Sequence, residues 1–378
     1  MSLSPYDSYR PPEEPRRKRR RRNRGPGGGA FRRGGGDGSR EMPMVPETEF
    51  TSYYGRPIVK APPWDSKIAT YLFLGGLAGG SAILALGAHL TDRPALRRNS
   101  RLSALGAAGL GSIALVADLG RPERFLHMMR TFKPTSPMSM GSWVLATFAT
   151  NAGVAAAVEV DRMTGQRLPL GPLRPVLHAV ETPTSVASGI LGAPMATYTA
   201  MLLGDTSVPT WHEMHGHLAF VFASSASLAS GGLAMLTTPV EQAAPARFFA
   251  VAGVAGELVA MRVMKDAMDP VTVEPIEQGR PGQWLEWSER LSIAGGLGAL
   301  LGGRRRWVAA ASGLALVSSS ALTRFGVFWG GKESVKDPKY TVIPQRNRLN
   351  KRRASGITDD SITTGPPSRT QTEHGGRP

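Results

Sequence analysis

Eight apolar segments between residues 67 and 328 limit the folds that are open to this sequence. A helix needs about 20 apolar residues to cross a bilayer, and most of these segments approach or exceed that length. The seventh is the shortest and is rich in glycine. The sequence therefore predicts an all-α membrane protein with about eight transmembrane helices. The segments are residues 67–90, 102–119, 141–160, 183–203, 215–236, 246–264, 291–303 and 307–328.

The two ends of the sequence differ sharply from this apolar middle. They are polar, charged and rich in proline and glycine, and they contribute most of the net charge of +16. Such segments have too few apolar residues to build a core. We therefore expect a disordered basic tail over residues 1–62, a polytopic membrane domain over residues 63–330, and a disordered polar tail over residues 331–378.

The basic run PRRKRRRRNRGPGGGAFRRGGG occupies residues 15–36. A lone basic tail can bind nucleic acid, but beside a membrane domain it more often contacts anionic lipid. We therefore expect membrane lipid as its partner and no nucleic acid. Short loops on both sides of the membrane carry arginines, so they do not decide the orientation. Moving the arginine cluster across a membrane is unfavourable, which favours cytoplasmic termini in the cell membrane.

The sequence has no cysteine, so the protein can ligate no conventional iron–sulfur cluster itself. A membrane cytochrome needs axial histidine pairs well inside the bilayer, whereas the histidines here fall at helix ends, in loops or in the tail. The run Trp211-His212-Glu213-Met214-His215-Gly216-His217 lacks the spacing of a structural zinc site. We therefore predict neither haem nor a dedicated metal site. Redox chemistry then requires an organic cofactor or a partner subunit.

Ionisable groups at membrane depth are costly and are functional candidates for that reason. Glu257 lies well inside the sixth segment, where it is neutral, paired across helices or lining a polar path. Arg262 and Asp266 are spaced to pair with each other on one helix face. Three further groups fall near helix ends: Glu159 and Asp161 at interfacial positions, and Glu181, which shares a helix face with His178 if the helix begins early.

The first apolar segment and the sequence after the second predict a quinone-type site. Such a site needs an apolar slot, hydrogen-bond donors for two carbonyls and an ionisable group that reaches water. The start of the first helix, the loop of residues 118–143 and the connection of residues 204–212 lie on the same side as the termini. Tyrosine hydroxyls and an imidazole suit the carbonyls, and Asp118 suits a proton relay. The candidate residues are Lys67, Tyr71, Asp118, Arg121, Ser136, Ser139, Trp143, Tyr198 and His212.

Four stretches of the sequence resemble the NrfD/PsrC family, the membrane subunits of polysulfide-reductase-type complexes. The resemblance covers residues 64–328, and the loop after the second helix is its most specific part. The stretches are YLFLGGLAGGSAIL, DLGRPERFLHMMRTFKPTSPMSMGSW, YTAMLLGDTSVPTWHE and LAFVFASSASLASGG.

The resemblance implies eight membrane helices in two four-helix bundles, without haem or an iron–sulfur cluster in this protein. It implies electron exchange between menaquinone and a four-cluster ferredoxin-like iron–sulfur subunit, which often serves a molybdopterin oxidoreductase subunit. It places the quinone head group near the start of the first helix. Lys67 and Tyr71 stand where the best-known family members have asparagine and histidine, while Asp118 and Tyr198 match the family pattern.

Two other functions remain open from the sequence. The protein can be a passive membrane anchor that tethers a cluster-bearing partner without exchanging electrons with quinone. It can also be a polytopic transporter, which typically has paired broken helices with charged residues at the midplane. Glu257 is the one charged residue that the predicted spans place near that depth.

Overall fold

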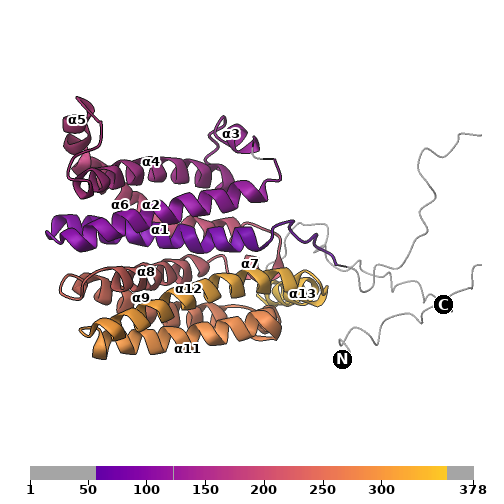
Figure 1. The fold of residues 1–378 in the computed structure, drawn as a ribbon. Helices are drawn as coiled ribbons and strands as arrows, with labels where there is room; N and C mark the ends of the chain where they lie inside the picture. The colour runs from indigo at the N-terminus through magenta and orange to yellow at the C-terminus, as the bar shows by residue number, and fades with distance from the viewer. Residues whose placement is uncertain (1–56, 122, 356–378) are drawn as a thin grey trace, which may run out of the picture. The chain divides into compact units, whose positions relative to one another are not determined.

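The computed structural model describes residues 57–121 and 123–355, and the described part is helical, with no strand. Eight helices of 20 or more residues form its body (Figure 1). Each of the eight predicted segments falls largely on one of them. These helices are α1 (Ser66–Leu90), α2 (Pro94–Asp118), α4 (Pro137–Met163), α6 (Glu181–Gly204), α8 (Leu218–Thr237), α9 (Ala244–Ala267), α11 (Gly279–Gly302) and α12 (Arg306–Ser334).

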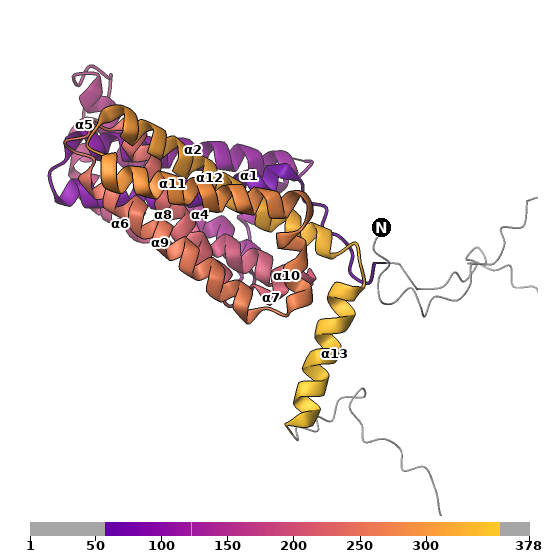
Figure 2. The same cartoon turned by 90° about the horizontal axis from the view of Figure 1, so that it is seen from below.

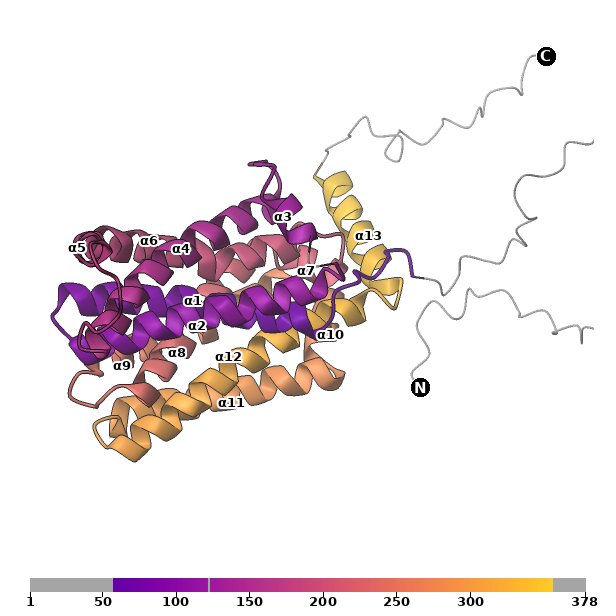
Figure 3. The same cartoon turned by 45° about the horizontal axis from the view of Figure 1, so that its top comes forward.

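Shorter helices cap the two ends of this body. The start of α1 lies at the same end as α3, α7, α10 and α13, and α5 lies at the opposite end (Figures 1 and 3). We call the end of the body that contains α7 the α7 end. The short helices are α3 (Arg124–Met128), α5 (Leu173–Ala179), α7 (Pro209–Glu213), α10 (Pro270–Glu277) and α13 (Lys339–Ala354).

Six of the eight long helices are long and apolar enough to cross a bilayer. They are α1, α2, α4, α6, α8 and α12, which confirms a multi-pass membrane architecture. Helices α9 and α11 do not reach this level, because charged residues occupy their halves near the α7 end. The predicted number of eight spans therefore stays a prediction.

The long helices form two groups of four, as the resemblance implies (Figures 1 and 3). In the first bundle α1 packs on α2 and α6, and α4 packs on α2 and α6. In the second bundle α8 packs on α9 and α12, and α11 packs on α9 and α12. Helix α1 also contacts α8 and α12, so it forms the centre of the contact between the two bundles.

Glycines on α1 allow this central position. At Gly79 an added Cβ would lie 2.3 Å from the backbone oxygen of Gly192 on α6. At Gly80 it would lie 2.3 Å from Ser230 Oγ on α8. Small residues therefore allow close packing of α1 on its neighbours, and Gly79 and Gly80 face one bundle each.

The C-terminal region differs from the predicted tail of residues 331–378. Helix α12 continues to Ser334, and α13 is helical through Ala354. Figure 2 shows α13 leaving the end of the bundle at a steep angle to α12. Polar side chains of α13 form ion pairs and hydrogen bonds with acidic residues of α7, of α10 and of the N-cap of α10. A search for apolar segments does not detect a helix that is held by polar contacts. Residues 1–56 and 356–378 of the predicted tails lie outside the described residues.

Candidate functional site

The start of α1 and the end of α2 meet at the α7 end. Asp65 caps α1 by accepting a hydrogen bond from the backbone N–H of Lys67 at 2.7 Å, and this bond holds the pKa of the carboxyl below its ordinary value. Lys67 Nζ lies 3.1 Å from the same carboxylate. Asp118, the last residue of α2, interacts electrostatically with both Asp65 and Lys67. The structure thus brings Asp118 and Lys67 together, as the sequence predicts.

Tyr71 lies four residues further along α1 than Lys67, about 6 Å deeper by helical rise. Its side chain is 2% exposed, and its ring meets that of Tyr198 on α6 edge to face, with centroids 6.4 Å apart. The hydroxyl of Tyr198 is buried and has no hydrogen-bond partner among the described residues. An unpartnered buried hydroxyl is unusual, because burying a polar group without a partner is costly.

Apolar side chains surround the two tyrosines. Tyr71 belongs to the core of the first bundle, with Leu145 and Phe148 of α4 and Met195 of α6, and the partly buried Tyr198 packs against this core. Helix α4 approaches closely because residue 141 is glycine, where a Cβ would lie 2.3 Å from Cε2 of Tyr198. The pair therefore forms a polar point inside apolar walls.

The loop between α2 and α4 folds back on the first turns of α4. Ser136 caps α4, and Ser139 Oγ donates to Thr131 O at 3.0 Å and accepts from Lys133 N at 3.0 Å. Trp143 Nε1 also donates to Thr131 O, at 3.4 Å. These three predicted site residues therefore hold the loop in place, and their contact with a quinone stays a prediction.

The remaining predicted residues lie outside the tyrosine pair. Arg121 is exposed in the loop just after α2. His212 is exposed on α7, because neighbouring Trp211 is fully buried and donates to Val327 O at 2.9 Å. The ring of His212 stacks on that of His215 at 5.6 Å and lines a separate cavity of about 480 Å³ between α7 and α13. His212 is not brought into contact with Tyr71 or Tyr198.

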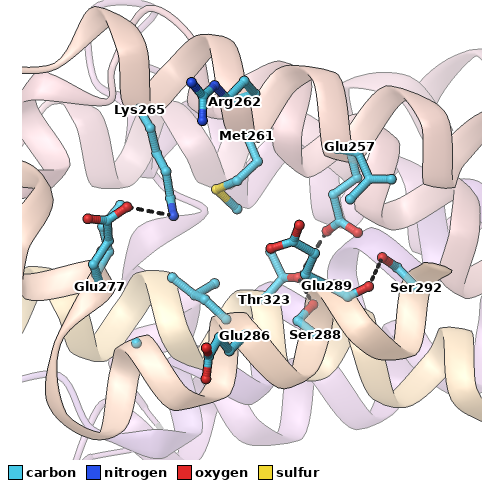
Figure 4. Close-up of a pocket in the computed structure, with 14 residues that line it drawn as sticks. Glu257, Met261, Arg262, Lys265, Glu277, Glu286, Ser288, Glu289, Ser292 and Thr323 are labelled. Carbon is cyan, nitrogen blue, oxygen red and sulfur yellow. Dashed lines mark hydrogen bonds and ion pairs between the residues drawn. The ribbon is translucent and has the colours of Figure 1, made fainter. Parts of the chain in front are cut away.

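A second polar centre lies in the second bundle. It contains Glu257, which the sequence analysis identified as a charged residue near the middle of the membrane. Thr323 donates to Glu257 Oε1 at 2.9 Å and is 2.6 Å from Ser288 Oγ. These groups line a cavity of about 360 Å³ between α9, α11 and α12 (Figure 4). Of the three alternatives for Glu257, pairing across helices is seen as its hydrogen bond with Thr323, while a neutral carboxyl and a polar path stay predictions. Neither this cavity nor the one beside α13 is lined by the tyrosine pair.

Arg324 completes this centre and was not singled out in the sequence. It is fully buried, lies 3.6 Å from the ring centroid of Phe222, and donates to Phe222 O at 2.7 Å. Its Nε and Nη1 atoms have no partner among the described residues. It interacts electrostatically with Glu257 and lies beside Gly76 of α1. Arg324 could have been found in the sequence as an arginine inside the apolar segment of residues 307–328.

The helices that hold the tyrosine pair lie within a region shared with a known family. The family described as "Polysulphide reductase, NrfD" matches residues 58–280. The protein belongs to this family. The predicted membership is confirmed, and the match contains every predicted site residue but ends at the start of α11.

Two curated relatives show the extent of the similarity within the NrfD family. "Protein NrfD" of Escherichia coli (strain K12) is 33% identical over 162 residues, covering 37% of this sequence and 48% of that protein. A subunit of the polysulfide reductase of Wolinella succinogenes is 29% identical over 153 residues, covering 37% of this sequence and 47% of that protein. The match thus spans about half the length of each relative.

At the end opposite the α7 end, the first bundle of this NrfD-family protein contains a buried ion-pair network. Arg101 on α2 is 2% exposed, and its Nη1 lies 2.9 Å from Glu159 Oε1 and 2.8 Å from Glu181 Oε1. Arg97 and Arg162 pair with the same two carboxylates. Glu159 is therefore buried and paired rather than a simple interfacial residue, because α2, α4 and α6 converge there.

The other charged pairs follow the sequence in part. Arg262 and Asp266 pair at 3.1 Å, as predicted. His178 does not share a contact face with Glu181 but lies 2.9 Å from the buried carboxylate of Asp161, because α5 is a separate short helix. Within residues 57–121 and 123–355, no three acidic or histidine side chains are grouped so as to hold a metal ion.

Proposed function

We propose that this NrfD-family protein is the membrane subunit of an oxidoreductase complex and exchanges electrons between menaquinone or menaquinol and an iron–sulfur partner subunit. One observation carries the proposal: the unpartnered hydroxyl of Tyr198 beside Tyr71, inside apolar walls and near the membrane end where Asp118 lies. Two phenol hydroxyls can donate hydrogen bonds to the two carbonyl oxygens of a quinone ring.

The residues suit distinct parts of this reaction. Oxidation of a quinol releases two electrons and two protons. The tyrosine hydroxyls are donors for the ring oxygens, and the half-exposed carboxylate of Asp118 accepts protons and passes them to water at the α7 end. Lys67, next to Asp118 through Asp65, keeps a positive charge near that path. The electrons pass to the partner, since this protein has no cysteine to ligate a cluster.

The partner is proposed to dock at the α7 end. The loop after α2 presents four exposed cations there: Arg121, Arg124, Arg130 and Lys133. A four-cluster ferredoxin-like subunit seated on this loop brings a cluster close to the tyrosine pair, and a molybdopterin subunit then receives or supplies the electrons. The name of one relative makes it one of several subunits of a polysulfide reductase, which supports a complex here too. We propose that the α7 end faces the cytoplasmic side of the cell membrane.

The second candidate is a passive membrane anchor for the same partner. The packing of Tyr71, which is only 2% exposed, favours it. In that case the tyrosine pair belongs to the core and no quinone enters.

Purifying the complex from native membranes separates the two functions. We expect menaquinone to co-purify with the complex, together with an iron–sulfur subunit whose clusters menaquinol reduces. Mass spectrometry of the lipid extract and the visible spectrum measure both. An assembled complex whose clusters menaquinol leaves oxidised would show that the protein is an anchor, and stoichiometric haem in this subunit would contradict the quinone-to-cluster route.

A further inference from the structure

One side of the second bundle differs from a lipid-facing surface. Helices α9 and α11 pack against each other, and they are the two long helices of the described residues that are not apolar enough to cross a bilayer. Yet both pack lengthwise on helices that are: α9 on α8, and α11 on α12. They therefore lie in the same layer as the spanning helices.

The depth of the charged part of α11 follows from its contacts. Ser288 on α11 lies 2.6 Å from Thr323 Oγ1 on α12, and the next residue of α12, Arg324, lies beside Gly76. Gly76 is ten residues from the start of α1, about 15 Å along its axis. Because α1 has 25 residues, Ser288 and its neighbour Glu289 lie level with the middle of a spanning helix.

Glu289 is an exposed carboxylate at this depth and forms no ion pair with a described residue. The charges around it are already paired. Arg262 pairs with Asp266 at 3.1 Å, Lys265 with Glu277 at 3.0 Å, and Arg290 with Glu286 at 3.4 Å. Figure 4 shows Glu289 at the cavity beside Thr323 and Ser292. Among the exposed acidic side chains of α9 and α11, Glu289 is therefore the one without an ion-pair partner among the described residues.

A charged carboxylate facing hydrocarbon at mid-bilayer is strongly unfavourable, so residues of this kind face protein or a polar cavity. Large apolar side chains lie on the same helices. Ile293, four residues after Glu289, is 40% exposed, Leu297 is 52% exposed, and Val259 on α9 is 64% exposed. Apolar side chains around one unpaired charge are typical of a helix–helix interface rather than of a lipid-facing surface.

We infer that the α9–α11 face binds a transmembrane helix of another subunit, and that this helix carries an arginine or lysine that pairs with Glu289 at mid-membrane depth. A second copy of this protein does not fit, because a symmetric interface would place the two unpaired Glu289 carboxylates on the same contact surface. The inference does not depend on quinone chemistry, and it adds an intramembrane partner to the peripheral one proposed above.

Photo-cross-linking in native membranes tests the contact directly. A p-benzoylphenylalanine in place of Leu297 should form an adduct with another subunit, mapped by mass spectrometry to a transmembrane segment that contains arginine or lysine. The same group in place of Leu110 on α2, which is 60% exposed, is the control and should give no such adduct. Adducts of position 297 with lipid alone, or with a second copy of the protein, would overturn the inference.

Charge reversal tests the pairing. Glu289→Arg should lower the yield of the co-purified intramembrane subunit about tenfold or more, as expected for loss of a desolvated charge pair. Replacing the partner's basic residue with glutamate should restore the yield. Glu241→Arg, in the exposed loop between α8 and α9, should leave it unchanged. An unchanged yield with Glu289→Arg would overturn the inference, and the cross-link at position 297 tests the contact without altering Glu289.

Discussion

At the scale of single residues, packing alone does not explain the hydroxyl of Tyr198. A phenylalanine would fill the same volume beside Tyr71 without burying a hydroxyl that has no partner. A buried polar group left unsatisfied costs stability. The proposed quinone would remove this cost by accepting a hydrogen bond from the hydroxyl.

Tyr198→Phe tests this argument. We expect the thermal stability of the purified protein to stay the same or rise by up to about 1 kcal/mol, because an unsatisfied hydroxyl is removed. Menaquinol turnover should fall about tenfold or more, because a donor to the ring is lost. Thermal unfolding and quinol-dependent reduction of the partner measure the two effects.

Tyr340→Phe is the matched control. This hydroxyl already donates to Glu274 Oε2 at 3.3 Å, on the outside of the bundle. The variant should leave turnover unchanged. A Tyr198→Phe protein that is less stable and turns over normally would show that the hydroxyl serves packing.

The sequence indicated some residues of the site and not others, for a physical reason. Tyr71 and Asp118 stand out because they are polar groups at the ends of apolar segments. Arg324 did not stand out, because its role depends on Phe222 and Glu257 from other helices. Glu159 was interpreted only as an interfacial residue, because its pairing with Arg101 depends on another helix. No local pattern shows that three helices converge on one point.

At the scale of elements, α1 is the helix that both bundles share. Its glycines alternate between α6 and α8, so close approach of backbones holds the bundles together. A methyl group added at Gly79 would meet the backbone of α6, which cannot move aside as a flexible side chain could.

Gly79→Ala should destabilise the protein by about 1–3 kcal/mol, because the added Cβ would lie 2.3 Å from Gly192 O and force α1 away from α6. Gly87→Ala, on the same helix with no atom within 4 Å of its Cβ, should be neutral or stabilising by about 0.5–1 kcal/mol. Thermal unfolding in detergent compares them. Equal effects of the two changes would contradict the packing account.

Helix α13 is attached by polar contacts that respond to pH. Burial lowers the pKa of Lys339, but its hydrogen bond to Glu274 outweighs this and raises the pKa above its ordinary 10.5. Burial also raises the pKa of Tyr340 above 10.0. Because both folded pKa values are raised, the stabilisation is fully present below the ordinary values and is lost as the pH rises through the folded ones.

We therefore expect α13 to detach at alkaline pH, above the ordinary pKa values of Lys339 and Tyr340. The sequence has no cysteine, so an Asn350→Cys variant carries a single spin label whose mobility reports detachment. The label should be immobile at neutral pH and mobile at high pH. Adding Glu274→Ala should make it mobile already at neutral pH. A label whose mobility is unaffected by either change would contradict the contact.

Two helices differ from their sequence-based predictions because charged or polar residues occupy them. The apolar pattern found all eight long helices but placed the seventh at residues 291–303, whereas α11 begins at Gly279. Glu286, Glu289 and Arg290 in its first half hid it. Helix α13 was missed because polar contacts with other helices, rather than an apolar face, hold it.

At the scale of the whole molecule, the two ends of the first bundle differ. The end near α5 is closed by the buried network of Arg101, Glu159 and Glu181. The α7 end has a half-exposed Asp118 and a long basic loop. Between them lies an apolar core that includes Phe148 and Ala152. Protons of a reaction at Tyr71 and Tyr198 are therefore expected to leave by the α7 end.

Menaquinol turnover by the assembled complex carrying Tyr71→Phe or Asp118→Asn tests the central claim most directly. We expect both variants to assemble with the iron–sulfur subunit in normal amounts, while reduction of its clusters by menaquinol falls at least about tenfold. The Tyr71 change removes a donor to the ring, and the Asp118 change removes the proton acceptor. Normal turnover in both variants would contradict the assignment of the quinone site to this end of the first bundle.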